Sequence, residues 1–169
     1  MALGLYLGIT AGVIIVGSFV YYYNKFVTFD NRIKNSTAQI DVQLRKRADL
    51  VPALVKVVKS FAKHEKSIMT EVTKARVDMM KGQNIAEKVK SGDKLQNALK
   101  SIFAIAENYP QLQSNQNFLH LQQELSAIED QVAYARQYYN DSILDYDNAT
   151  QDFQEYSSLN YMVKKRKNI

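Results

Sequence analysis

The opening of the chain is mostly apolar and carries no charge. From Leu3 to Tyr23, 21 consecutive residues carry no charge, and as a helix they would be about 31 Å long and cross the hydrocarbon core of a bilayer. No basic residue precedes this stretch and no small-residue cleavage site follows it. We therefore expect an uncleaved transmembrane anchor over residues 1–23 rather than a signal peptide. A buried helix of a soluble protein is the alternative interpretation.

Charges next to the anchor predict its orientation. Lys25, Arg32 and Lys34 follow it closely, whereas no Lys or Arg precedes it. Positive charge is retained on the inner side of the membrane. We expect a single membrane crossing, with the N-terminus outside and the C-terminal domain in the cytoplasm.

Small residues repeat inside the predicted anchor. Glycine occupies every fourth position at Gly4, Gly8 and Gly12, which places the three residues along one face of a helix. Such a face lets two membrane helices approach closely and favours self-association. Glycine is also frequent in membrane helices in general, so an accidental repeat is the second interpretation.

After the anchor, apolar residues recur at steps of three and four, the spacing of helices that bury one face. The pattern runs unbroken from Phe26 to Leu44, so the membrane helix should continue into a first cytoplasmic helix. A second helix is predicted to begin with Asp49 as N-cap and Pro52 in the first turn and to end at Lys81–Gly82. A single rod kinked at Pro52 is the alternative.

A polar connector is expected at residues 82–93, with partial helix as the alternative, and two more helices follow it. Asp93 is placed to cap a short third helix, which Pro110 ends. The fourth helix, residues 115–153, has an apolar seam with a period of about 3.5 residues, which requires partner helices. We predict an all-α fold, in which the transmembrane helix continues into an up-and-down antiparallel four-helix bundle over 24–153, followed by a basic tail over 154–169.

The charges are segregated along the chain, whose net charge is +5. Residues 24–81 contain 13 Lys and Arg against 6 Asp and Glu, whereas residues 82–163 contain 5 against 11. The acidic fourth helix is therefore expected to lie against the basic first and second helices. Little positive field would remain for phosphate, which argues against nucleic acid as a partner. The absence of cysteine excludes disulfides and thiolate chemistry.

Seven short sequence blocks occur in order along the chain. They are AQIDVQL at 38–44, DLVP at 49–52, AKHE at 62–65, ENYP at 107–110, NFL at 117–119, LQQEL at 121–125 and, most specific, AYARQYYND at 133–141. Together these blocks resemble the LemA family of bacterial membrane proteins. The resemblance implies a single-anchor protein of the bacterial plasma membrane with a cytoplasmic up-and-down helical bundle, and it implies no settled biochemical activity.

The chain departs from the family pattern in two respects. Thr37 and Ala48 stand where the family commonly has aromatic residues. After Phe153, the family's proline-containing tail is replaced by the sequence QEY and a basic end. Functions that depend on that tail are therefore not transferred to this chain.

The sequence offers no catalytic or cofactor-binding set. His64 lacks the second histidine of a zinc protease motif, because Ile68 stands four residues later. His120 and Glu124 lie one helical turn apart and are interpreted as a surface ion pair, since two metal ligands without a third rarely hold an ion. We predict no catalytic residue, no metal and no cofactor.

Arg136 is the only Lys or Arg between Glu107 and Glu155. We expect it to form an interhelical bridge to Asp41 or Asp49 that fixes the helix register more than it adds stability.

Two basic clusters are expected to lie at the surface. The cluster at residues 45–47 (RKR) should be solvated or contact a partner. The end of the chain, with Lys164, Lys165, Arg166 and Lys167, is expected either to contact anionic lipid or to remain a soluble tail.

Taken as a whole, the sequence favours a non-catalytic, membrane-anchored helical scaffold that self-associates as a homo-oligomer and organises or shapes the bilayer. An alternative of a different class is an adaptor or accessory subunit. It would dock another membrane protein, such as a protease or sensor, through the first two helices. An enzyme is the third interpretation, and no residue pattern supports it.

Overall fold

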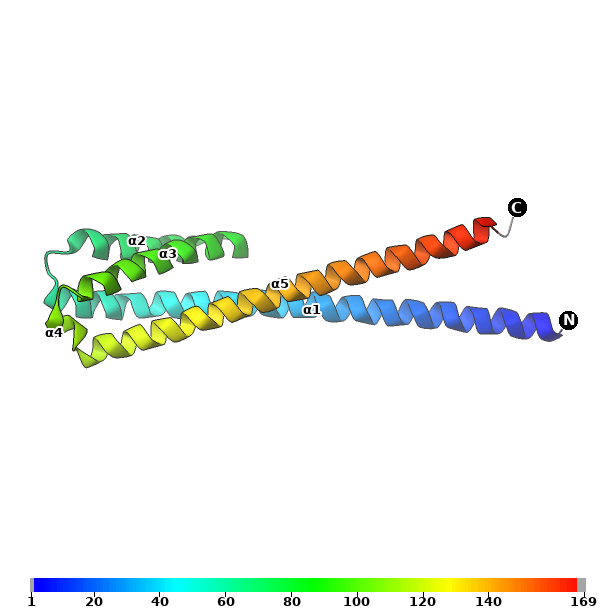
Figure 1. Ribbon diagram of the computed structural model, residues 1–169, viewed down its shortest axis with the longest axis horizontal. Coiled ribbons are helices and arrows are strands. Elements are labelled where there is room, and N and C mark those ends of the chain that lie inside the picture. Colours follow the sequence, from blue (N-terminus) through cyan, green and yellow to red (C-terminus); the bar gives the residue numbers. More distant parts are fainter. Residues whose placement is uncertain (1, 167–169) are drawn as a thin grey trace. The chain divides into compact units, whose positions relative to one another are not determined.

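A computed structural model describes residues 2–166, and it describes side chains for residues 3–154. The chain forms α1 (Ala2–Phe61), α2 (Lys66–Lys81), α3 (Ile85–Ala106), α4 (Pro110–Gln113) and α5 (Gln116–Arg166), and no strand occurs among the described residues (Figure 1). The predicted all-α class is confirmed. The side chains of Lys164, Lys165, Arg166 and Lys167 lie outside the described residues, so their lipid contact stays a prediction.

The chain divides into two units, which are described separately. The bundle unit is Ser36–Gln137, and the helix-pair unit combines Met1–Asn35 with Tyr138–Ile169. Within the bundle unit, the end of α1, then α2, α3 and the start of α5 alternate in direction (Figure 1), which confirms the up-and-down arrangement. Within the helix-pair unit, aromatic rings join α1 to α5: the ring centroids of Phe26 and Tyr146 lie 5.6 Å apart.

Helix α1 continues through Pro52. The predicted start of a second helix at Asp49 is therefore wrong, and the alternative of a single rod is correct. Proline lacks an N–H, so it leaves the carbonyl four residues earlier, that of Ala48, without its helical hydrogen bond. Arg76 of α2 supplies a donor: its Nε donates to the Ala48 oxygen at 2.8 Å. A side chain from a neighbouring helix thus compensates for the proline inside α1.

The helix predicted over residues 51–81 is interrupted between Phe61 and Lys66, although it ends at Lys81 as expected. No residue in this short segment opposes a helix by its own chemistry. Packing is the cause, since the Ala62 side chain is fully buried and the Glu65 carboxylate accepts a hydrogen bond from the Tyr109 hydroxyl at 3.2 Å. Partial burial raises the pKa of Tyr109, and the neighbouring Glu65 raises it further.

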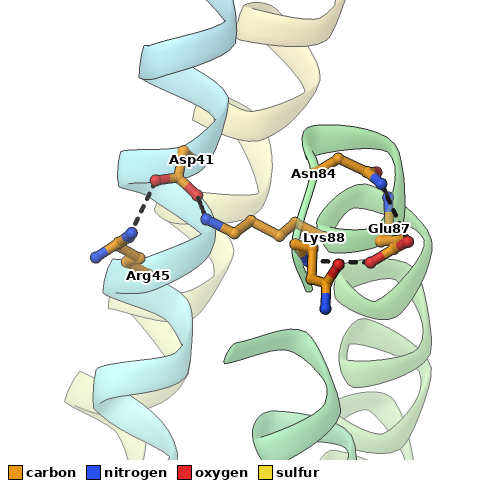
Figure 2. Close-up of polar contacts among 6 residues, drawn as sticks. Asp41, Arg45, Asn84, Glu87 and Lys88 are labelled. Carbon is orange, nitrogen blue, oxygen red and sulfur yellow. Dashed lines mark hydrogen bonds and ion pairs between the residues drawn. The ribbon is translucent and has the colours of Figure 1, made fainter. Parts of the chain in front are cut away.

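Helix α3 begins at Ile85, within the predicted connector and well before Asp93. Its start is a capping box: the Asn84 side chain accepts from the Glu87 N–H at 2.9 Å, and the Glu87 carboxylate accepts from the Gln83 N–H at 3.0 Å (Figure 2). The prediction overlooked this Asn-x-x-Glu signal. Helix α5 starts close to the expected residue but continues to Arg166 instead of ending at Phe153.

The core of the bundle unit is apolar, and α1 approaches α3 closely. The contact point is Gly92, where an added Cβ would lie only 2.7 Å from Leu44 Cδ2. Close approach of two helices at this point therefore depends on the missing side chain. The buried side chains of the core come from α1, α2, α3 and α5 and include Ile40, Leu44, Leu54, Val72, Leu95, Leu99, Ile102, Phe118, Leu125 and Val132.

Candidate interaction sites

The anchor presents its apolar side chains outward. Helix α1 contains a stretch with mean hydropathy 2.1, and none of that stretch is buried within the molecule. Each buried Å² of such surface is worth about 25 cal/mol, so a long uncharged helix left uncovered by its own chain requires lipid around it. The protein is membrane-anchored, whereas its orientation and the particular membrane stay predictions.

The predicted glycine stripe lies on this uncovered helix. A Cβ added at Gly4, Gly8 or Gly12 would meet no atom within 4 Å. Packing inside the chain therefore does not explain why these positions lack side chains. The space they leave is available to another helix, and self-association through them stays a prediction.

The bridge from Arg136 forms, but with a different acid. Its Nη2 lies 2.6 Å from Asp93 Oδ1 of α3. Asp41 instead accepts from Lys88 of α3 at 2.6 Å and from Arg45, one turn away on α1, at 3.0 Å (Figure 2). The expected partners Asp41 and Asp49 were therefore wrong, because the register of α3 brings Asp93 to Arg136.

The Lys88–Asp41 pair lowers the pKa of the Asp41 carboxyl. The hydrogen bond from Lys88 lowers the pKa of Asp41, and the charges of Lys88 and Arg45 act in the same direction against the opposing effect of burial. The pair joins α1 to α3 a short distance along the helices from the Gly92 contact. It helps to hold the position of α3. The first residues of α3 lie in the segment that was expected as a connector.

The cluster at residues 45–47 was expected at the surface, but Arg47 is buried. Its side chain is only 2% exposed, and Nε has no hydrogen-bond partner among the described residues. Burial lowers the pKa of Arg47; the charges of Glu129 and Asp93 oppose that effect, and Arg136 adds to it. Glu129 also accepts a hydrogen bond from Gln96, and the side chains of Glu129 and Asp93 remain partly exposed, so the buried guanidinium lies near acids at the bundle surface. Arg47 lies three residues after Leu44 and four before Val51, at a seam position of α1, and its burial was missed because basic residues are mostly exposed.

Two grooves open on the surface of the bundle unit. The α1/α5 groove, about 430 Å³, is lined by Gln39, Gln43, Asp130, Gln131, Tyr134 and Ala135. The α1/α2 groove, about 680 Å³, has an apolar floor that includes Val55, Met69 and Val77 and a rim that includes Lys59, Lys66, Lys74 and Lys81. The first is largely neutral and the second strongly basic, so they suit different partners.

The histidines do not assemble a metal site. His120 Nε2 lies 3.3 Å from Glu124 Oε1, and both side chains are largely exposed, as the surface-pair interpretation expects. Across the described part of the chain, no three His, Cys, Asp or Glu side chains come together in a way that could hold an ion.

Comparison with known proteins gives a family match and distant relatives. The family model described as LemA family matches residues 36–168. Similar proteins include magnetosome protein MamQ of Magnetospirillum gryphiswaldense, 27% identical over 150 residues that cover 73% of this chain and 55% of the relative. Magnetosome proteins MamQ 1 and MamQ 2 of Paramagnetospirillum magneticum are each 25% identical over 151 residues, covering 74% and 56%. The chain spans a little over half the length of these relatives.

Proposed function

The chain belongs to the LemA family, and from this premise we propose that it is a non-catalytic, membrane-anchored helical scaffold that self-associates through its anchor. The relatives are named magnetosome proteins, a name that specifies no reaction. We assign the scaffold no cofactor, metal or nucleic acid. Its proposed place is a bacterial plasma membrane, with the N-terminus outside and the bundle in the cytoplasm, as the charges that follow the anchor favour.

One observation carries this proposal: the open glycine face of the anchor. Gly4, Gly8 and Gly12 leave a continuous strip without side chains on a helix that its own chain leaves uncovered. In lipid, helices associate by close packing, since lipid tails are as apolar as the side chains, and small residues permit that packing. An assembly built on this contact would organise or shape the membrane that holds it.

The test compares two glycines of the same helix. Gly8→Ile fills the stripe, whereas Gly17→Ile adds the same bulk about two and a half turns further along, on the opposite face; a Cβ at Gly17 also meets no atom within 4 Å. Native mass spectrometry of the full 19.3 kDa chain in detergent should show oligomers for the unaltered protein and for Gly17→Ile. The oligomeric fraction should fall at least several-fold for Gly8→Ile. Monomers for all three proteins would refute the proposal.

The α1/α2 groove favours a second candidate, an adaptor that docks another membrane protein. Four lysines surround its apolar floor, and Val77 is itself partly exposed, so an acidic amphipathic helix is the complementary partner. Photo-crosslinking from position 77 in cells separates the two functions. One dominant foreign protein would favour the adaptor, and adducts between copies of this chain would favour the scaffold.

A further inference from the structure

The α1/α5 groove contains a polar atom without a partner. Gln43 contributes to the lining, and its Oε1 is buried without a hydrogen bond among the described residues. Leaving a buried amide oxygen unpaired is unfavourable, so a turn of the Gln43 side chain toward a hydrogen-bond donor placed in the groove would remove that cost. The neutral amides of Gln39 and Gln131 next to it fit a polar but uncharged group.

A side chain with that chemistry stands at the edge of the same groove. Tyr134 is 70% exposed, an unusual state for a large aromatic residue, and Val42 is 48% exposed on the neighbouring helix. A tyrosine has an apolar ring to fill a groove and a hydroxyl that donates and accepts hydrogen bonds. The groove and the side chain that would fill it therefore lie beside each other on one molecule.

We propose that this surface is a two-fold contact between two copies of the chain, in which Tyr134 of each copy enters the α1/α5 groove of the other. In a two-fold contact, the same patch meets itself, so a groove and a projecting side chain on one patch satisfy each other twice. The Gln43 amide of the second copy then turns into the groove to accept from the Tyr134 hydroxyl, and the two exposed Val42 side chains lie at the border of the contact. This inference rests on the proposed self-association and assigns it a second surface, outside the anchor.

Among the described surfaces, this patch has the charge distribution that best suits a two-fold contact. A strongly charged patch repels its own copy in a two-fold contact. The rim of the α1/α2 groove carries four lysines, and α5 beyond the bundle unit carries exposed Asp141, Asp147 and Asp152. The groove lining contains one acid, Asp130. Lys46 lies one turn beyond Val42 on α1 and is exposed, so a base near the patch offsets this acid.

The absence of cysteine in the chain makes the contact directly testable. Gln131→Cys introduces a thiol in the groove lining, and Asn97→Cys places a matched thiol at an exposed, neutral position of α3. The full-length proteins are reconstituted in vesicles of phosphatidylglycerol and phosphatidylethanolamine and treated with a short bismaleimide. We expect a covalent dimer of the Gln131→Cys protein and at least a fivefold lower yield for Asn97→Cys.

A second substitution tests the role of the aromatic side chain. Adding Tyr134→Ala to Gln131→Cys should lower the yield of dimer several-fold, and Tyr134→Phe should lower it less, because the ring remains and only the hydroxyl is lost. Circular dichroism melting of each protein checks that the bundle is folded. An unchanged melting curve is expected for an exposed residue.

The outcomes distinguish this contact from the anchor contact. Equal crosslinking at positions 131 and 97, or a yield indifferent to Tyr134→Ala, would overturn the two-fold groove contact. If oligomers that depend on Gly8 persist in that case, the proposed function stands without it. Specific crosslinking at position 131 that survives Gly8→Ile would support the groove contact and show that it forms without the anchor contact. A foreign protein captured at position 131 in place of a second copy would also overturn the inference.

Discussion

The glycines of the anchor and the glycine of α3 show two opposite uses of a missing side chain. At Gly4, Gly8 and Gly12 an added Cβ meets nothing within 4 Å, whereas at Gly92 it would lie 2.7 Å from Leu44 Cδ2. Gly92 is needed because another helix of the same chain already occupies the space. The anchor glycines leave a space that the chain itself does not fill. At Gly92 the chain therefore completes its own packing, whereas the anchor must be completed by lipid or by another molecule.

The largest expected effect on stability comes from comparing one substitution, glycine to valine, at Gly92 in the bundle and at Gly8 in the anchor. Gly92→Val should destabilise the bundle by about 1–3 kcal/mol, because the added methyl groups force Leu44 and the two helices apart. Gly8→Val should change the unfolding free energy by less than about 0.5 kcal/mol, as substitutions at open positions do. Urea unfolding of both full-length proteins in detergent, followed by circular dichroism, measures the difference. Equal destabilisation by the two substitutions would remove the distinction between the regions.

The second prediction concerns the backbone of α1 near Pro52, where the Ala48 carbonyl accepts its hydrogen bond from Arg76 of α2. Arg76→Met removes the donor to the Ala48 carbonyl and should cost about 1–2 kcal/mol, since that carbonyl then has no partner. In a Pro52→Ala background, the restored N–H at position 52 satisfies the same carbonyl, so the cost of Arg76→Met should shrink to roughly half or less. A cost that is the same in both backgrounds would show that Arg76 acts in another way.

The smallest expected effect comes from the Lys88–Asp41 pair, and it depends on pH. The pKa of Asp41 is lower in the folded than in the unfolded protein, so the pair contributes stability above the unfolded value of about 4 and loses it as the pH falls through the folded value. Asp41→Asn should cost about 0.5–1 kcal/mol at pH 7, and the cost should disappear in acid. Asp30→Asn, which breaks the exposed Lys34 pair, is the control and should cost less than about 0.5 kcal/mol. A cost of Asp41→Asn that does not vary with pH would contradict the role of the ion pair.

Features with a local cause could be predicted from the sequence, and features with a distant cause could not. The uncharged run from Leu3 to Tyr23 can be found within one segment of the sequence. The seam of α5 follows from the spacing of apolar residues within one helix. Pro52 was misinterpreted because its compensation comes from Arg76, which is far away in the sequence. The capping box at Asn84 is the exception, since its signal is local and was overlooked.

The candidate sites divide in the same way. The spacing of Gly4, Gly8 and Gly12 is visible in the sequence, and the structure adds that the space beside them is open. The isolation of Arg136 among acids correctly predicted an interhelical bridge, but Asp93 became its partner through the register of α3. The spacing of α1 places Arg47 between the buried residues Leu44 and Val51, but the charge of its side chain led to the expectation of an exposed residue.

Fluorescence energy transfer between full-length chains in lipid vesicles tests the central claim most directly. Donor- and acceptor-labelled proteins are mixed and diluted with lipid at constant labelling. The account predicts transfer well above that of randomly placed anchors, declining with lipid dilution as an association equilibrium requires and shifting to higher protein density for Gly8→Ile but not for Gly17→Ile. Transfer no greater than random placement at every dilution would show that the open face of the anchor has no partner among copies of this chain.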